Sequence, residues 1–384
     1  MRPFTRGISS ARSATVLVPA LLAVSALVTA CGSTTQTSEG LSPAALEGAQ
    51  ATVREAEKVP TTISATTPLT KRPPTGKSIV FLQDGTQPSV EIYAGIQEAA
   101  EALGWTARSI KFDPADLSTL NAGLLQALTT GADYVVDSGF PESQLSPSTV
   151  AKFRSAGVPI IVVGTTPVPG TDTLLGDYGD QNHYVLAGKQ LADWFVADAQ
   201  GQGSAVVVNL TTYPSLTLFT DSFSAEVTKI CPSCKTETIK STIGDALNGT
   251  LTAQVIAKLR ADRSIKYAVF DNSGEIAGLD AQLKTAGRTD VKVLGHGIDP
   301  GALKSLKSGQ AKAFIAYNFR YAGWAAMDIA ARESVGDPVA NPNSVQPSRL
   351  ITSATANQLP ANAIFREPAD GLQQFKKLWL VPGP

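Results

Sequence analysis

Residues that do covalent or metal chemistry are scarce in this sequence. It holds three Cys and two His among 384 residues. That count excludes histidine-rich metal sites and multi-cysteine clusters, and it leaves little room for a Ser/His/Asp catalytic set. Neither a Gly-x-Ser-x-Gly elbow nor a Walker loop occurs. We therefore expect neither an enzyme nor a protein that carries a metal or another cofactor.

Cys231 and Cys234 form the motif Cys-Pro-Ser-Cys. Outside the cytoplasm such a motif is typical of a local structural disulfide, and the alternative is a redox-active thiol pair. A redox pair usually follows a strand and opens a helix. This motif instead follows a predicted helix over 216–230 and precedes a strand that begins near Lys235. We therefore favour the structural disulfide.

A glycine-rich segment, Gly-His-Gly-Ile-Asp-Pro-Gly at 295–301, follows a predicted strand and opens a predicted helix. A dinucleotide-binding loop has the same placement. Pro300 stands where such a loop needs a glycine, however, and no acidic residue follows about twenty positions later. We interpret the segment as a turn at the end of a strand.

The first thirty residues have the organisation of an export signal. Three Arg precede an uncharged stretch from Ala14 to Ala30 that is rich in Ala, Val and Leu and too short to favour a membrane span. The stretch ends Leu-Val-Thr-Ala-Cys31, which resembles the bacterial lipobox, where the cysteine is acylated and becomes the new N-terminus. We expect a signal peptide over 1–30 and lipid of the palmitate type on Cys31. The lipid would hold the protein outside the cytoplasm on the cell membrane, because two or more acyl chains anchor far better than one.

Composition separates a spacer from the rest of the chain and excludes one class of partner. Residues 31–76 are rich in Ser, Thr, Ala, Gly and Pro, and predict a flexible tether with room for a short helix over 42–58.

The net charge is -1 and charged residues make up 17%. Without a basic stripe, nucleic acid is not expected as a partner. We expect a monomer.

From Lys77 onward, short apolar runs alternate with segments of helical spacing, which predicts α/β lobes with parallel sheets covered on both faces. Two successive arrays predict two similar lobes, over 77–180 plus 319–350 and over 181–318 plus 351–384. The last helix, 321–333, and the strand 349–352 are expected to return toward the first lobe. The predicted strands are 77–82, 107–112, 133–137, 158–163, 173–175, 205–210, 236–239, 267–270, 291–294, 313–316 and 349–352. The other predicted helices are 89–104, 117–130, 146–156, 181–199, 216–230, 251–261, 275–286 and 301–308.

Five segments recur in a characteristic order and spacing: Gly95-Ile-Gln-Glu-Ala-Ala-Glu-Ala-Leu-Gly104, Gly157-Val-Pro-Ile-Ile-Val-Val163, Ala187-Gly-Lys-Gln-Leu-Ala192, Ala268-Val-Phe-Asp-Asn272 and Val291-Lys-Val-Leu-Gly295. In this order and spacing the chain resembles the type I periplasmic binding proteins of the ribose-binding cluster, over roughly 77–352. The resemblance implies two Rossmann-like lobes joined by a three-segment hinge, with a small-molecule ligand between them. It also implies an ABC permease and its ATPase as partners in sugar transport. A receptor for a membrane signalling partner and an exported hydrolase are the alternatives.

Residues just after the strands are expected to line the cleft, because ligands of open parallel sheets sit beyond the carboxyl ends of the strands. Each candidate also has a structural alternative, such as a helix cap for the Asp residues or a buried core role for the His residues. The candidate ligand-binding residues are Asp84, Gln87, Phe140, Thr165, His183, Tyr213, Asp271, Asn272, His296 and Tyr317.

The resemblance to the sugar-binding members is incomplete at the expected site. Asn272 falls where they have an Asn that bonds hydroxyls. After strand 158–163 this chain has Gly164-Thr165-Thr166 instead of their Asp-Arg pair, and Gly or Thr cannot replace the fixed donor fork of Arg. Gly297 stands where they have an Asp. We expect a less charged, more aromatic cleft, and a monosaccharide, a deoxy sugar, a polyol and an aromatic or terpenoid-like acid all stay open as ligands.

Overall fold

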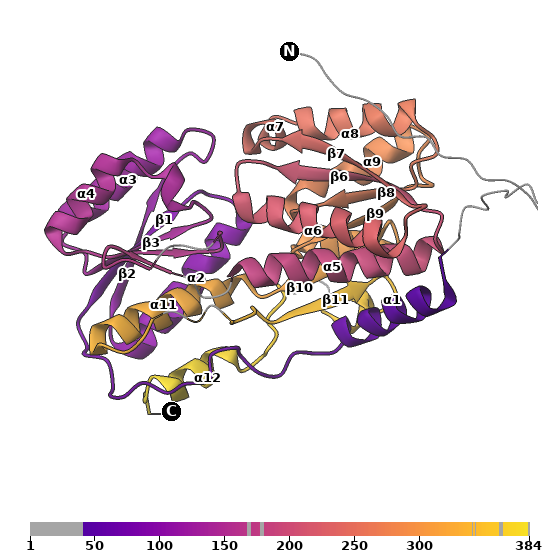
Figure 1. Cartoon of the computed structure of the whole chain (residues 1–384). Coiled ribbons are helices and arrows are strands. Elements are labelled where there is room, and N and C mark those ends of the chain that lie inside the picture. The colour runs from indigo at the N-terminus through magenta and orange to yellow at the C-terminus, as the bar shows by residue number, and fades with distance from the viewer. Residues whose placement is uncertain are drawn as a thin grey trace, which may run out of the picture. The chain divides into compact units, whose positions relative to one another are not determined.

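The computed structural model describes residues 41–166, 170–176, 180–339, 341, 343–360 and 364–382. The predicted signal peptide and Cys31 lie outside the described residues. Over the described residues the chain forms two lobes, each built on one sheet with helices on its faces (Figure 1). The α/β class and the two-lobed architecture predicted from the sequence are confirmed.

The first sheet is parallel throughout, in the order β2-β1-β3-β4-β5. All four residues of β4 are buried, because a parallel sheet is covered on both faces. Helices α3 and α4 pack on one face, and α2 and α11 on the other (Figure 1). The elements are β1 (Ser78–Gln83), β2 (Thr106–Lys111), β3 (Tyr134–Ser138), β4 (Ile160–Val163), β5 (Leu174–Leu175), α2 (Gln87–Leu103), α3 (Leu117–Thr129), η1 (Glu142–Gln144), α4 (Pro147–Ala156) and α11 (Phe319–Val335).

The second sheet has the order β11-β10-β9-β8-β6-β7, and only β11 runs antiparallel to its neighbour. Side chains from the sheet and from its helices form one continuous apolar core. The elements are α5 (Asp180–Ala199), β6 (Ser204–Leu210), α6 (Pro214–Ile230), β7 (Lys235–Ser241), α7 (Ile243–Leu247), α8 (Thr250–Ala261), β8 (Tyr267–Phe270), η2 (Ser273–Ile276), α9 (Leu279–Thr285), β9 (Lys292–His296), α10 (Pro300–Ser308), β10 (Ala311–Tyr317), β11 (Ser348–Thr352) and η3 (Ala356–Gln358).

Two predictions about this second half are wrong. The helix expected over 275–286 is divided into η2 and α9, because Gly278 between them has a φ of 73°, which lies outside the helical region. The strand expected to return to the first lobe is β11, and it instead pairs with β10 in the second sheet. The last passage between the lobes therefore precedes β11.

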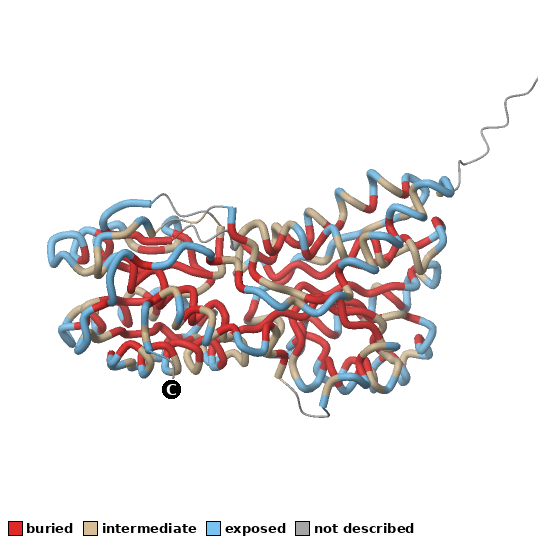
Figure 2. The backbone as a smooth tube through the Cα atoms, turned by 90° about the horizontal axis from the view of Figure 1, so that it is seen from below, coloured by how far each residue is buried: buried red, intermediate tan, exposed pale blue. Residues whose placement is uncertain are grey.

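The segment before β1 also differs from the predicted flexible tether. Residues 43–56 form helix α1 (Pro43–Ala56), which begins at an N-cap Ser42 and buries Ala49 and Ala56. Farther along, Ile63 and Leu69 are buried in the core of the first lobe. Figure 2 colours each described residue by how far it is buried. The short helix expected over 42–58 is thus present, and the rest of the segment from 41 onward is partly packed on the lobes; residues 31–40 of the predicted tether lie outside the described residues.

The C-terminal tail packs on the first lobe, whereas the sequence placed it with the second. Helix α12 (Gly371–Leu378) buries Phe375, and Trp379 after it is fully buried. The backbone N–H of Leu69 donates to the carbonyl of Leu378 at 2.9 Å, so the segment before β1 and the tail lie side by side (Figure 1). Because α1 and the tail each add a passage, the chain runs between the lobes at two places beyond the three-segment hinge.

Helices α2 and α11 cross so closely that their backbones touch. A Cβ added at Gly95 would collide with the carbonyl oxygen of Arg320, and one at Gly323 with that of Ile92. These two glycines therefore allow the contact, and the two helices together carry part of the wall described below.

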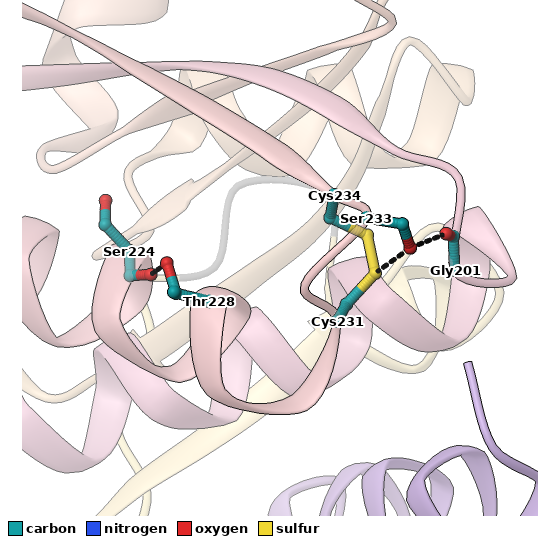
Figure 3. Close-up of a disulfide and its surroundings, with 6 residues drawn as sticks. All are labelled: Gly201, Ser224, Thr228, Cys231, Ser233 and Cys234. Carbon is teal, nitrogen blue, oxygen red and sulfur yellow. Dashed lines mark hydrogen bonds between the residues drawn. A yellow bond between two sulfur atoms is a disulfide. The ribbon is translucent and has the colours of Figure 1, made fainter. Parts of the chain in front are cut away.

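Cys231 and Cys234 form the predicted disulfide, with Cα atoms 5.3 Å apart (Figure 3). As expected, the motif follows a helix, α6, and precedes a strand, β7. The hydroxyl of Ser233 donates to the carbonyl of Gly201 at 2.7 Å, which ties this turn to the loop after α5. The bridge closes a surface turn.

Candidate functional site

A cavity of about 280 Å³ lies between the lobes. In the first lobe, Asp84 follows β1 and Gly164 follows β4. In the second lobe, Asn272 follows β8 and Asp299 follows β9. The walls are thus built from the carboxyl ends of parallel strands in both sheets, which is where ligands bind in this type of sheet.

Half of the ten candidate residues line the cavity: Asp84, Gln87, Tyr213, Asn272 and Tyr317. The hydroxyl of Tyr213 donates to Oδ2 of Asp84 at 3.0 Å, a hydrogen bond between the lobes. Burial and the Asp84 carboxylate raise the pKa of Tyr213, so the phenol stays protonated. Nearby, Nε2 of Gln144 donates to the carbonyl of Thr212. The two lobes are in direct contact at the edge of the cavity.

The other five candidates are buried behind the cavity wall, contrary to expectation. Phe140 belongs to the core of the first lobe and packs against Tyr213, with ring centroids 5.2 Å apart. Thr165 is buried beside Gly164, which itself lines the cavity. His183, His296 and Asp271 are almost completely buried and do not line the cavity.

His183 and His296 form a buried pair whose Nε2 atoms are 3.0 Å apart. Burial lowers the pKa of His183 to about 4, and burial together with His183 lowers the pKa of His296 well below its ordinary value. The pair is therefore neutral at pH 7, so its two N–H groups serve three contacts: the one between the rings and one from each Nδ1 to a carbonyl oxygen, of Gln346 and of Asp271. Nδ1 of His183 lies 3.3 Å from the carbonyl of Gln346, whose side chain donates to the carbonyl of Asn318. His183 and Gln346 thus connect the three hinge segments.

Two carboxyl groups, those of Asp271 and Glu275, are buried next to each other. Asp271 is fully buried, and its Oδ2 accepts from the backbone N–H of Leu210 at 2.7 Å. Burial raises its pKa to about 7. Burial and the charge of Asp271 raise the pKa of Glu275 well above its ordinary value. The two carboxyls can share a hydrogen bond only when one of them is protonated, so at neutral pH the pair holds a proton.

A further acid, Asp137, is fully buried in β3, and neither of its oxygens has a hydrogen-bond partner among the described residues. Burial, aided by the nearby charge of Asp84, raises the pKa of Asp137 well above its ordinary value. Neither Asp137 nor Asp271 lines the cavity; the acidic residues that do are Asp84, Glu275 and Asp299.

Several lining residues escaped the sequence reasoning, among them Glu275, Tyr184 and Gln346. Glu275 lies three positions after Asn272, so the strand-end rule would have found it had it been extended by one turn of η2. Tyr184 is on α5 after the first passage, and Gln346 is on the last passage before β11. No periodicity or motif marks a residue in an irregular connection, and Gln346 had no such signal.

Aromatic rings fill the part of the cleft around Gly297. That residue has a φ of 73°, and a Cβ added to it would lie 3.3 Å from the ring of Phe319. The rings of Phe319 and Tyr317 stand edge to face with centroids 4.7 Å apart. Because these rings occupy the space, the absence of an Asp at this position is matched by a more aromatic wall, as predicted.

Among the described residues, no cluster of three His, Cys, Asp or Glu side chains is arranged to hold a metal ion. In the same part of the chain, no helix combines the length and the apolar character that a membrane span requires.

No curated protein sequence matches the chain. Solved structures that resemble it include three solute-binding proteins of transporters. One is from Agrobacterium vitis with bound allitol, at 22% identity over 74% of this chain and 98% of that chain, with a TM-score of 0.62. Another is from Agrobacterium radiobacter in complex with D-arabinose, at 20% identity over 76% and 98%, with a TM-score of 0.63.

The third is the 5-methylthioribose transporter protein from Thermotoga lettingae in complex with 5-methylthioribose, at 16% identity over 82% and 99%, with a TM-score of 0.63. At these identities the likeness concerns the fold. The family model described as periplasmic binding protein domain matches residues 79–338, well over half of the 384 residues. The chain therefore belongs to the periplasmic binding protein domain family, whose members bind solutes outside the cytoplasm rather than catalyse reactions.

Proposed function

We propose that this protein is a lipid-anchored receptor that captures a small sugar-like or other polar, partly apolar ligand and delivers it to an ABC permease and its ATPase. The observation that carries the proposal is the cavity lined from both lobes. A ligand held there contacts both lobes at once, and closure around it changes the surface offered to a membrane partner.

The lining suits a ligand with hydroxyl groups on one side and an apolar face on the other. Asn272 and Gln87 supply amide donors and acceptors, whereas Ile92 and Leu216 supply apolar surface. The volume of about 280 Å³ is close to the lower end of ordinary small-molecule sites. The carbohydrates named for the structural relatives support a ligand of this size.

We expect at least one of D-arabinose, allitol, 5-methylthioribose and the hexoses with their amino derivatives to raise the melting temperature of the purified protein, because a ligand that binds only the folded state stabilises it. Asn272→Ala should weaken that binding about tenfold, the effect of about one hydrogen bond. Isothermal titration calorimetry measures the affinity. The matched control is Asn357→Ala, an exposed residue in η3 far from the lining. Equal affinity for both variants and the wild type would remove Asn272 from the site.

The lipid anchor rests on the sequence around Cys31. We expect Cys31→Ser to move the protein from the membrane fraction to the medium or the soluble extract, because the serine hydroxyl cannot take the thioether-linked lipid and the acyl chains are lost. Immunoblotting of the fractions measures this. The double variant Cys231→Ser/Cys234→Ser is the control and should stay with the membrane. A Cys31→Ser protein that stays there as well would contradict the anchor.

A further inference from the structure

The wall that the second lobe gives to the cavity changes from polar to apolar across the sheet. The strands β9, β8, β6 and β7 lie side by side in that order, with β7 at the edge. Polar lining residues, Asn272 and Asp299, follow β8 and β9. Next to them the lining is mainly aliphatic, because Leu210 ends β6, Leu216 lies in the first turn of α6, and α7 follows β7. The part of the cavity beside the edge strand is therefore apolar.

Helix α7 carries most of this apolar part. All three of its lining residues, Ile243, Ala246 and Leu247, have aliphatic side chains. A capping box closes the first turn of the helix, and the backbone N–H of Ile243 donates to Oγ1 of Thr212 at 3.0 Å. These hydrogen bonds fix α7 beside the connection between β6 and α6, so its aliphatic residues form a surface that exists before a ligand binds.

The first lobe approaches α7 from the opposite side of the cleft. A Cβ added to Gly244 in α7 would lie 4.0 Å from the Cβ of Ala115, which follows β2. The hydrogen bond from Tyr213 to Asp84 joins the lobes at the neighbouring strands, because Tyr213 follows β6 and Asp84 follows β1. A group bound against α7 therefore lies between the two lobes.

Leu247 presents apolar surface to water at this part of the cavity. Its exposed fraction is 69%, the highest among the large apolar side chains of the described residues. Five such side chains are exposed in that part of the chain, and Leu247 alone among them lines the cavity. An apolar ligand group placed here removes this surface from water, which favours binding. A hydroxyl placed here would lose its hydrogen bonds to water and find only aliphatic side chains, which opposes binding.

The charges of the lining disfavour one class of ligand. The acidic lining residues are Asp84, Glu275 and Asp299, and within the described ranges no Lys, Arg or His lines the cavity. Proteins bind carboxylates and phosphates mainly through Arg and Lys. A ligand with an acid group would therefore enter this cavity without a cation to pair with it.

We propose that the ligand is a neutral sugar or polyol with an aliphatic substituent, and that Ile243, Ala246 and Leu247 of α7 form the subsite that receives this substituent. The inference rests on the proposed function and deepens it. Because the apolar surface is continuous with the polar part of the same cavity, one ligand covers both. Its hydroxyl groups face the side of Asn272, and its alkyl, alkylthio or deoxy carbons lie against α7.

The test compares matched pairs of probes that differ in the aliphatic group: D-ribose with 5-methylthio-D-ribose, D-galactose with 6-deoxy-D-galactose, and D-glucose with isopropyl β-D-glucopyranoside. Each carbon buried against α7 should raise the affinity about fourfold. Isothermal titration calorimetry on the full chain should therefore show at least one substituted member binding about tenfold or more tightly than its parent.

Variants of α7 show whether this preference arises at the proposed subsite. Leu247→Ser should reduce the preference for the substituted member at least about threefold, and Ala246→Asn should reduce it as well, because each replaces apolar contact by a polar group. The side chain of Leu247 is largely exposed, so Leu247→Ser is expected to fold. Leu186→Ser is the matched control, an exposed leucine of α5 outside the lining, and should leave the preference as it is.

The outcomes separate this inference from the proposed function. If probes bind but no substituted member exceeds its parent about tenfold, or if both α7 variants keep the preference while their melting curves show them folded, the subsite is wrong and the receptor function stands.

If no probe binds, the protein is incubated with a whole-cell extract and the retained compound is identified by mass spectrometry and nuclear magnetic resonance. A neutral polyhydroxylated compound with alkyl, alkylthio or deoxy carbons supports the inference. A fully hydroxylated sugar or an acid overturns it. A protein that retains nothing from probes or extract contradicts the proposed function itself.

Discussion

Gly323→Ala is expected to lower the free energy of unfolding by about 3 kcal/mol or more, and Gly323→Leu to leave little folded protein. A Cβ at this position collides with the backbone of α2 at Ile92. Overpacking normally costs about 1–3 kcal/mol when side chains can move aside, but here the obstacle is backbone. Relief requires α2 and α11 to separate, which opens the core of the first lobe. A typical domain has only about 5–15 kcal/mol to lose.

Urea unfolding followed by circular dichroism measures this effect. The control is Gly48→Ala, the same substitution within helix α1, where an added Cβ meets no atom within 4 Å. Gly48→Ala should stabilise the protein by about 0.5–1 kcal/mol, because alanine is the better helix former. If Gly323→Ala unfolds at the same urea concentration as the wild type, the close crossing of α2 and α11 is not a feature of the protein.

The free energy of unfolding of the unliganded protein is expected to fall as the pH rises from about 6.5 to 8. Burial raises the pKa of Asp137 and Glu275 well above their ordinary values, and raises that of Asp271 to about 7. In this window the unfolded chain has already released these protons, whereas the folded protein still holds some of them. The folded state thus binds more protons than the unfolded state, and stability is lost with each step upward in pH.

The buried histidines act in the opposite sense, but at lower pH. His183 has its pKa lowered to about 4, and His296 is also lowered. Between about pH 4 and 6.5 these histidines bind protons in the unfolded state but not in the folded state, so their contribution to the free energy of unfolding increases with pH. At about pH 6.5 half of these histidines are still protonated in the unfolded chain, so their contribution ends only near about pH 7.5. Above that pH the carboxyl groups alone determine the slope.

Asp137→Asn should reduce this loss of stability by up to about 1.4 kcal/mol per pH unit, the slope of one proton held only in the folded state. The amide has the shape of the acid but does not titrate. Urea unfolding at several pH values between about 6.5 and 8 measures the slope. Asp172→Asn, an exposed acid of the first lobe, is the control and should leave the slope as it is. A wild-type stability that is constant or rises over this range would show that these carboxyls are not protonated in the folded protein.

The buried residues behind the cavity wall show the limit of predicting ligand-binding residues from the ends of strands. Such reasoning correctly placed Asp84 and Asn272 on the cavity wall. It gave the same status to Asp271 and His296, which are also at strand ends. The end of a strand determines how far along the sheet a residue lies, but the pleat determines to which face its side chain points. The side chains of Asp271 and Asn272, which are consecutive, therefore point in different directions.

The tail and the segment before β1 show a second limit. The sequence predicted a flexible tether for the first and assigned the second to the other lobe. In the structure, Ile63 and Trp379 complete the apolar core beside α11. Ile63 precedes α11 by more than 240 residues, and the indole N–H of Trp379 donates to Asp328 in α11, 51 residues earlier in the chain. A contact of that range leaves no trace in local composition, because each segment alone looks like an exposed connection with a few apolar residues.

By itself, the sequence determined the order of strands and helices, the parallel sheets, the division into two lobes and the disulfide turn. These depend on apolar runs, helical spacing and turn residues that lie near one another in the chain. Only the tertiary structure decided that β11 joins the second sheet, that His183 and Gln346 connect the hinge segments, and that Asp271 and Glu275 are buried together. Each of these depends on which side chains from distant parts of the chain come into contact, and on which side chains are shielded from water, once both lobes have packed.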